Sequence, residues 1–345
     1  MKLSKILMVA AVMAVCGGSR ADACSRVVYL GDTGTVLVGR TLDWRTPIPT
    51  NIYVYPSGID KESSNSGHRL QWRSQYGSVL AVGYDGGVTE GMNSEGLIVN
   101  GLFCKNSRYP VAVEGSDTPV MSLAVFVSYF LDNFATVGEV DTWLKANKFA
   151  IAGATFDGGT VSLLHWGITD RSGETLIMEF IEGELTTYRG RELQVLTNDP
   201  ALPKMQAIEG YWQAVGGVNM LPGTVRSADR FVRASFFIHH VPTGFDYDRA
   251  WGSLNSIMGN VAVPYGYEIE GEPNISSTQW TSIADAAGKY YFRFADNKGA
   301  FWIDLGRLVL TPGAPVLKLD TTNHTNLEGC VNSRLVQSAP FAPMW

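Results

Sequence analysis

A cysteine at position 24 comes directly after a segment that has the three parts of a secretory signal peptide. Residues 2–23 begin with a lysine, carry an apolar run over residues 6–15 and end in Ala21-Asp22-Ala23. This order predicts cleavage after Ala23. The apolar run is too short to span a bilayer, which takes about 20 residues. Cleavage would make Cys24 the first residue of the mature chain, so the fold would begin on a residue that carries both a thiol and a free α-amine.

Such a residue combines a nucleophile with its own base. The reference pKa is about 8.5 for a thiol and about 7.7–8.0 for an α-amine, so the amine can take the thiol proton near neutral pH without a histidine. Two other interpretations stay open on the local sequence. Cys24 would be the acylated residue of an exported, lipid-anchored binding protein, or one half of a disulfide. Lipid attachment would require a Leu-like residue three positions earlier, where this chain has Ala21.

The composition describes a globular chain with ample core. Of the 345 residues, 45% are hydrophobic and 17% are charged, so disorder is not indicated. The chain shows no linker and no repeat, which predicts a signal peptide over residues 1–23 and a single domain over residues 24–345. The net charge is −6 without a Lys/Arg cluster, which argues against nucleic acid and anionic membranes as partners. The apolar stretch 119–131 is too short for a membrane span and predicts a buried helix.

Cysteine and histidine usage excludes the common metal sites. The five histidines show no metal-ligand spacing, so neither a metal nor a cofactor is expected. Three cysteines follow the predicted cleavage point, namely Cys24, Cys104 and Cys330. An odd number in an exported protein indicates a free thiol. A disulfide between Cys104 and Cys330 and two buried free thiols are equally compatible with the sequence.

The predicted elements alternate between groups of strands and groups of helices. Strands are expected at 25–30, 35–44, 51–55, 77–84, 96–104, 161–168, 174–182, 192–197, 277–284, 289–295 and 300–305. Helices are expected at 119–133, 137–147, 201–215, 228–240 and 246–258. The first two strands predict a hairpin, because a Gly-Asp-Thr-Gly cluster separates them. This order favours two sheets packed face to face with helices outside.

Two charged residues interrupt the second strand of that hairpin. Arg40 and Asp43 are three positions apart, so they face opposite sides of a regular strand. A bulge or a strand end would bring both to one site. A cation near Cys24 would favour its thiolate, and a carboxylate would hold an α-amine. A surface ion pair is the alternative.

Asn198 and Arg230 also stand at positions where a functional role competes with a structural one. Asn198 ends a strand before Asp199-Pro200, where its side chain can donate to an oxyanion or simply form a turn. Arg230 lies in the first turn of a helix that Ser227 is predicted to cap. A cation there opposes the helix dipole, and such a conflict is more expected at a functional site. A solvated arginine is the alternative.

Five stretches together resemble the choloylglycine hydrolase and penicillin V acylase family. They are CSRVVY from residue 24, GRTLDW from 39, GMNSEGL from 91, VLTNDP from 195 and SADRFVR from 227. Members of this family are N-terminal nucleophile hydrolases that cleave linear amide bonds. The resemblance covers residues 24 to about 295. It implies an α+β fold, the four-layer αββα sandwich, which agrees with the order of elements.

The matching motifs also imply roles for individual residues. Cys24 would be the nucleophile and its own α-amine the base. Asp43 would bind that amine, and Arg40 would sit beside the sulfur. Asn198 would donate to the oxyanion, and Arg230 would hold the network of carboxylate and thiolate.

Phe103 departs from the pattern of the family members that hydrolyse bile salts, which commonly carry Asn there. Acylases of the family tend to have an aromatic residue instead. The Phe103 backbone N–H can still donate to an oxyanion, but its side chain cannot. The resemblance therefore favours penicillin V or an acyl-homoserine lactone as the small-molecule amide substrate, with conjugated bile salts as the alternative. It also implies a periplasmic or secreted enzyme that forms a homo-oligomer, a tetramer.

Overall fold

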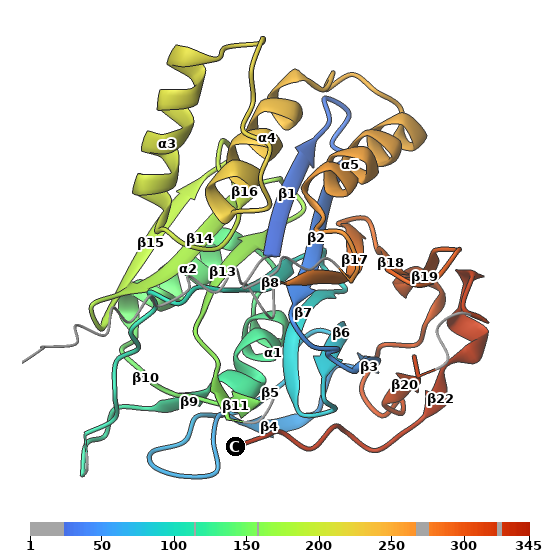
Figure 1. Ribbon diagram of the computed structural model, residues 1–345. Coiled ribbons are helices and arrows are strands. Elements are labelled where there is room, and N and C mark those ends of the chain that lie inside the picture. The colour runs from blue at the N-terminus through green and yellow to red at the C-terminus, as the bar shows by residue number, and fades with distance from the viewer. Residues whose placement is uncertain (1–23, 114, 157–158, 267–275, 323–325) are drawn as a thin grey trace, which may run out of the picture.

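Two large sheets lie face to face in the computed structural model, with helices on the outer face of each (Figure 1). The structure describes residues 24–113, 115–156, 159–266, 276–322 and 326–345. The predicted signal peptide, residues 1–23, lies outside the described residues. The arrangement confirms the four-layer αββα sandwich that the resemblance implied.

The first sheet has seven strands and contains the predicted hairpin. Its order is β16 (Val195–Leu196), β1 (Cys24–Leu30), β2 (Val36–Trp44), β17 (Ser277–Asp285), β18 (Lys289–Phe294), β19 (Phe301–Asp304) and β21 (Gly329–Cys330). Cys24 pairs with Leu42 across the hairpin, and Gly34 closes its turn at a φ of 86°, a conformation that glycine adopts without steric cost. The hairpin therefore fixes the position in space of Cys24, the predicted first residue of the mature chain.

The second sheet has nine strands. Its order is β15 (Glu184–Gly190), β14 (Thr175–Ile181), β13 (Leu164–Thr169), β8 (Ile98–Phe103), β7 (Gly87–Asn93), β6 (Ser78–Gly83), β3 (Thr50–Tyr55), β20 (Leu317–Leu319) and β22 (Val336–Gln337). Three short pairs stand apart: β4 (Asp60–Glu62) with β5 (Gln71–Arg73), β9 (Val120–Ser122) with β10 (Ala150–Ala152), and β11 (Thr155–Phe156) with β12 (Thr160–Val161).

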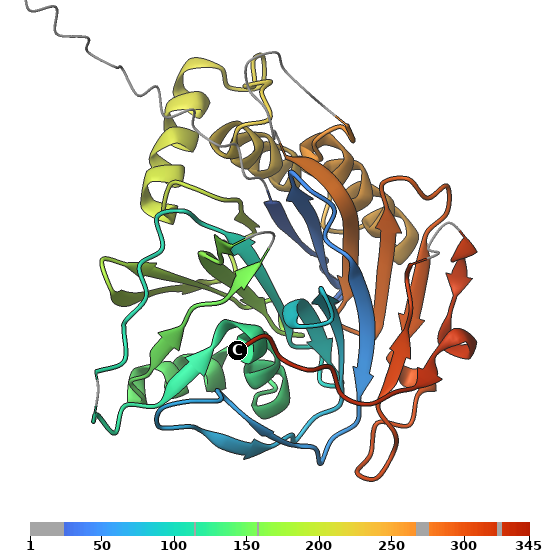
Figure 2. The same ribbon diagram turned by 60° about the horizontal axis from the view of Figure 1, so that its bottom comes forward.

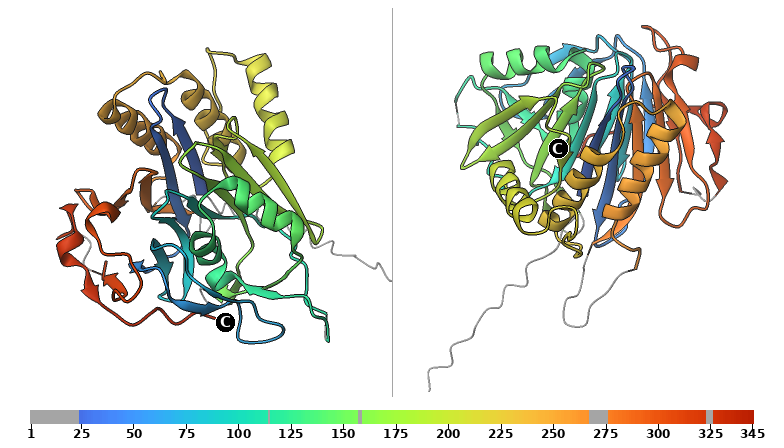
Figure 3. Two further views of the ribbon diagram at one scale, coloured as in Figure 1. Left: turned by 180° about the vertical axis from the view of Figure 1, so that it is seen from behind. Right: turned by 90° about the horizontal axis from the view of Figure 1, so that it is seen from above.

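Helices form the two outer layers, as the view from above shows (Figure 3). The helices are α1 (Leu123–Asn133), α2 (Val137–Ala146), α3 (Leu202–Val215), α4 (Ser227–His240) and α5 (Tyr247–Val261), with short 3₁₀ turns at Leu305–Arg307 and Asn332–Arg334. α1 and α2 pack on the nine-stranded sheet, and α4 and α5 pack on β1 and β2. Thr136 and Glu139 form a capping box at the start of α2, which satisfies backbone donors that a helix start leaves open.

Three hydrophobic cores fill the spaces between the four layers. One lies between α1, α2 and the nine-stranded sheet, a second between the two sheets, and a third between the seven-stranded sheet and α4 and α5. Strand residues alternate between two faces, so a strand in such a sandwich buries both. All nine residues of β2 are buried accordingly, Arg40 and Asp43 included.

Candidate active site

Cys24 is the first residue of β1 and is buried, with 4% of its surface exposed. Its backbone nitrogen donates to Asn198 Oδ1 at 2.6 Å. Its sulfur lies 3.9 Å from Arg40 Nη2 and 4.0 Å from the Asp43 carbonyl oxygen. The strand end thus brings the thiol into contact with both charged residues of β2, although their side chains point to opposite faces.

Arg40 lies between the two sheets and is held by a buried carboxylate. Its Nη2 donates to Gly101 O at 3.0 Å, and its Nη1 lies 3.3 Å from Glu90 Oε2. Glu90 accepts further hydrogen bonds from Ser282, Tyr290 and Asn100. Burial and then Glu90 raise the pKa of Tyr290 well above its ordinary value, so its hydroxyl stays a donor. A buried charge of each sign is compensated in this way, and the interpretation of Arg40 and Asp43 as a surface pair is wrong.

Asp43 faces the helix layer and is anchored by two threonines. Thr278 Oγ1 donates to Oδ1 at 2.6 Å and Thr41 Oγ1 to Oδ2 at 3.1 Å. Burial raises the pKa of Asp43, whereas Arg230, whose Nη1 lies 3.8 Å from Oδ2, opposes that rise. The register between β2 and β17 shifts just after Thr278.

Arg230 is fully buried, so the interpretation as a solvated arginine is wrong. Its Nη1 donates to Cys24 O at 2.7 Å and to Ser25 Oγ at 2.5 Å, and its Nη2 donates to Asn198 Oδ1 at 2.8 Å. Burial lowers the pKa of Arg230, and the carboxylate of Asp43 opposes that fall. α4 therefore carries a cation that ties the start of β1 to the end of β16.

The helix start differs by one residue from its prediction. Arg226 is the N-cap of α4, and Ser227 is the first helical residue. The Ser227 hydroxyl instead accepts from the backbone N–H of Asn198 at 2.9 Å and donates to Thr197 Oγ1. Ser227 therefore connects α4 to the segment that follows β16.

Asn198 is buried two residues after the end of β16 and joins several groups. Its Oδ1 accepts from Cys24 and Arg230, and its Nδ2 donates to Phe103 O at 2.7 Å. The residue before it is held by a buried histidine: His165 Nε2 donates to Thr197 O at 2.6 Å, and Nδ1 faces Glu179 Oε1 at 3.2 Å. Burial by itself would lower the pKa of His165, but Cys104 and Glu179 outweigh it and raise the pKa to about 10.

A cavity of about 110 Å³ opens beside Cys24. Four aromatic residues stand together on its wall: the ring centroids of Trp44 and Phe103 are 5.2 Å apart, those of Trp44 and Phe156 5.2 Å, and those of Tyr84 and Phe156 6.1 Å. Aliphatic side chains complete the wall, namely Leu42, Ile48, Val88, Leu123, Leu164 and Met344. The cavity is therefore apolar around a polar end that holds Cys24, Arg40 and Asp43.

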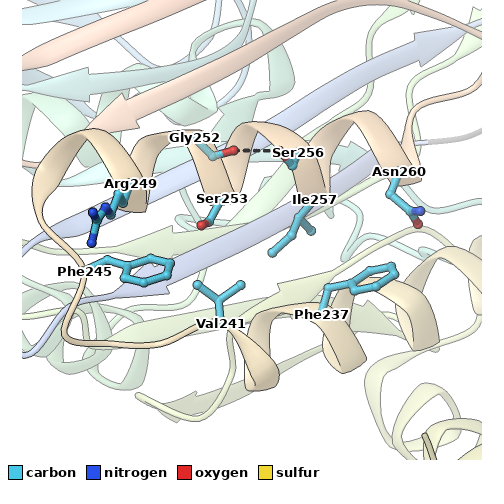
Figure 4. Close-up of a pocket in the computed structure, with 9 residues that line it drawn as sticks. All are labelled: Phe237, Val241, Phe245, Arg249, Gly252, Ser253, Ser256, Ile257 and Asn260. Carbon is cyan, nitrogen blue, oxygen red and sulfur yellow. Dashed lines mark hydrogen bonds between the residues drawn. The ribbon is translucent and has the colours of Figure 1, made fainter.

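A larger hollow of about 620 Å³ lies elsewhere, in a groove between α4 and α5 (Figure 4). Phe237 of α4 and Val241, the residue that caps the end of α4, line it opposite Ile257 of α5. None of the described residues that line it is a cysteine, a histidine or an acid. The groove offers no nucleophile paired with a base, so the chemistry belongs to the smaller cavity at Cys24.

The structure brings all six predicted site residues together. In the chain with residues 1–23 attached, Cys24 N is a peptide nitrogen and donates to Asn198 Oδ1, while the Asp43 carboxylate accepts from Thr41 and Thr278. Binding of the free α-amine by Asp43 stays a prediction for the processed chain. Sequence reasoning missed Glu90 and His165. His165 interrupts the apolar run Leu163-Leu164-His165-Trp166, which was the available signal for it; Glu90 stands among glycines and polar residues, and nothing local marked it.

Cys104 and Cys330 are both free thiols, so the disulfide between them is excluded in this structure. Cys104 follows β8 of one sheet, whereas Cys330 ends β21 at the edge of the other. Within the described parts of the chain, no group of three or more potential metal ligands occurs. No described helix combines the length and the apolar character that crossing a bilayer would take.

Comparisons with known proteins identify the family of this chain. The family model for "Linear amide C-N hydrolases, choloylglycine hydrolase family" matches residues 24–325. A penicillin V acylase of Pectobacterium atrosepticum is 34% identical over 98% of this chain and 96% of its own length. A bile salt hydrolase/transferase of Bifidobacterium longum is 24% identical over 79% of this chain and 92% of its own.

Solved structures show the same fold. Penicillin V acylase from Agrobacterium tumefaciens superposes with a TM-score of 0.85 and 38% identity, covering 93% of this chain and 99% of that one. A mutant conjugated bile acid hydrolase from Clostridium perfringens gives a TM-score of 0.72 at 23% identity, covering 86% and 96%. With the family model matched from Cys24 onward, the chain belongs to the choloylglycine hydrolase family of linear amide C–N hydrolases.

Proposed function

We propose that this chain is an exported penicillin V acylase that uses Cys24 as its nucleophile once residues 1–23 are removed. The observation that carries the proposal is a buried cysteine at the polar end of an apolar, aromatic cavity. The likeness to two penicillin V acylases supports it. The bile salt hydrolases that match are less similar in sequence.

The reaction would begin with transfer of the thiol proton to the α-amine of the same residue. The thiolate, with Arg40 Nη2 at 3.9 Å from the sulfur, attacks the amide carbonyl carbon. The ammonium then returns its proton to the leaving nitrogen, and the C–N bond breaks to leave a thioester. The amine next takes a proton from water, which attacks the thioester, and the carboxylic acid and the free thiol are released.

Asn198 and Phe103 would stabilise the oxyanion. Asn198 Nδ2 has two N–H groups, and Phe103 O accepts one of them. Cys104 N donates to Leu163 O across β8 and β13, so the adjacent Phe103 N–H points away from β13, on the same side as its own carbonyl. One donor would thus come from the end of β8 and the other from the segment that follows β16, and an oxyanion site needs both to point at one atom.

The cavity favours an acyl group the size of one aromatic ring. Its volume is about 110 Å³, and an apolar cavity of roughly 150 Å³ takes up benzene. A phenoxyacetyl group would gain about 25 cal/mol for each Å² of apolar surface buried against Trp44, Phe103 and Phe156. A steroid is larger, and its hydroxyls would lose hydrogen bonds to water there. The aliphatic part of the wall also suits an alkyl chain, so acyl-homoserine lactones are the second candidate class.

The test compares substrates and chain starts. A chain that begins at Cys24 should hydrolyse penicillin V with a kcat/KM about tenfold or more above that for glycocholate or taurocholate. The matched control retains Ala23, which turns the Cys24 amine into an amide and should lower kcat by about 10²–10⁴-fold. Equal rates with and without Ala23 would contradict the N-terminal base. A clear preference for bile salts would overturn the substrate and leave the mechanism standing.

Export to the periplasm or medium, with Cys24 unmodified, and assembly as a homotetramer are parts of the same proposal. The sequence of residues 2–23 supports export, and the family resemblance supports the assembly. The intact mass of protein recovered from the periplasm decides the first, because an acylated Cys24 would instead indicate the lipid-anchored binding protein. Light scattering on the purified chain decides the second, and a monomer would exclude it.

A further inference from the structure

The last residues of the chain run back across the molecule to the Cys24 cavity. After β22, Ser338 N donates to Val316 O, and the chain continues past α1 to its end near the centre of the view in Figure 2. Phe341 is buried, and its ring lies 5.9 Å from Tyr53 and 6.2 Å from Tyr55. Its backbone N–H also donates to the Tyr55 hydroxyl at 3.0 Å. Residues 338–345, called the tail here, are therefore anchored by one aromatic residue.

Three residues past this anchor, the tail reaches the turn between β6 and β7. Met344 N donates to Gly86 O at 2.8 Å. A Cβ built on Gly86 would collide with Met344 Cγ and lie 2.9 Å from its sulfur. The Met344 side chain thus occupies the space that a side chain at Gly86 would fill. A backbone hydrogen bond and this side-chain packing together fix the position of Met344.

Met344 belongs to the wall of the Cys24 cavity, together with Gly83, Tyr84 and Gly87 of the same turn. The family match, in contrast, ends at residue 325. The cavity wall is therefore made of residues from the matched region and of one side chain that lies beyond it.

We propose that the tail is a specificity element and that Met344 limits the size of the acyl group. The identity of the acyl group rests on the proposed function, whereas the position of Met344 in the cavity wall does not depend on that function. A methionine suits this place because its unbranched thioether adapts to the ring or chain beside it. A shorter side chain at position 344 would lengthen the cavity. Acyl groups with a second ring would then make contacts that are not available when Met344 is present.

The experiment uses processed full-length chains and two amides of one amine. One amide carries the phenoxyacetyl group and the other the larger 4-phenylphenoxyacetyl group. In Met344→Ala, the ratio of kcat/KM for the larger over the smaller amide should rise about tenfold, the effect of a few methylenes in an apolar pocket. Trp345→Ala is the matched control, because Trp345 is 44% exposed and does not line the cavity. Phe341→Ala, which releases the anchor, should move the ratio in the same direction as Met344→Ala.

A second readout keeps the result independent of amide turnover. Benzyl and biphenylmethyl methanethiosulfonate react with the Cys24 thiolate, which forms an S–S bond to the arylmethylthio group while the sulfinate leaves. Met344→Ala should speed the larger reagent relative to the smaller one, as followed by mass. If the processed wild-type chain cleaves neither amide, the proposed function fails. The ratio of the reaction rates of the two thiosulfonates then tests by itself whether Met344 limits the cavity. Ratios within about twofold of wild type in both readouts, or an equal shift in Trp345→Ala, would overturn the proposal.

Discussion

At the residue scale, the side-chain amide of Asn198 accepts hydrogen bonds through its oxygen and donates them through its nitrogen, each to different partners. Its Oδ1 accepts from Cys24 N and Arg230, whereas its Nδ2 faces Phe103 O. Asp in its place keeps both acceptor positions and loses the donors. Asn198→Asp should therefore lower kcat by about 10²–10³-fold, the size of one lost oxyanion donor.

The measurement is kcat for penicillin V at saturation, with the unfolding temperature of each variant recorded beside it. Asn147→Ala serves as the control, because Asn147 lies exposed at the end of α2 and bonds only locally, to Trp143 O. A normal kcat in Asn198→Asp would remove this side chain from the oxyanion site.

At the element scale, local patterns predict the hairpin and the five helices but not every strand of the two sheets. The run 119–133 predicts one helix, but β9 occupies Val120–Ser122, and Ser122 caps α1 by accepting from Ala124 N. Local patterns do not predict β7, β15, β20 and β22 of the nine-stranded sheet. β7 (GVTEGMN) holds two glycines, β15 carries polar, partly exposed residues, and β20 and β22 are only three and two residues long. Tertiary pairing, rather than propensity, makes such segments strands.

The end of β16 is held by a buried His165–Glu179 pair that should make stability depend on pH. Both His165 nitrogens face atoms that only accept, Thr197 O and the Glu179 carboxylate, so the folded state keeps the imidazolium. Burial by itself would lower the pKa of His165, but Cys104 and then Glu179 raise it from 6.5 to about 10. The stabilisation is complete below the unfolded value and is lost as pH rises through the folded one. The free energy of unfolding should therefore decline between pH 6.5 and about 10.

Urea unfolding across that range checks this decline. His165→Gln should be less stable at pH 6.5, and its free energy of unfolding should fall less with rising pH than that of the wild type. His68→Asn is the control, because His68 is exposed, and it should follow the wild-type curve. Parallel curves for wild type and His165→Gln would mean that His165 does not hold its extra proton.

At the scale of the whole molecule, the site is assembled from contacts across long stretches of chain. Cys24 meets Asn198 and Arg230 across 174 and 206 residues, and Glu90 meets Ser282 across 192. Family motifs located Cys24, Asn198 and Arg230, because a motif identifies a residue from its sequence neighbours and does not depend on how the chain folds. Glu90 and Met344 could not be located in this way, since their roles depend on which buried charge or cavity wall the packed layers place beside them.

The same arrangement keeps the three cysteines apart, which predicts three free thiols in the mature protein. Cys104 follows β8 of one sheet, Cys330 ends β21 of the other, and Cys24 stands at the start of β1. Alkylation of the processed chain in denaturant without reductant should add three groups by mass. Cys330→Ser should add two groups, whereas addition of only one group to the wild type would reveal a disulfide.

The close fit of Met344 against Gly86 sets a rule for comparing related sequences. A chain with a side chain at the position of Gly86 has no room for a methionine at the position of Met344. These two positions, 258 residues apart in the chain, should therefore covary among relatives, and a lineage that gains bulk in the β6–β7 turn should also redirect or shorten its tail.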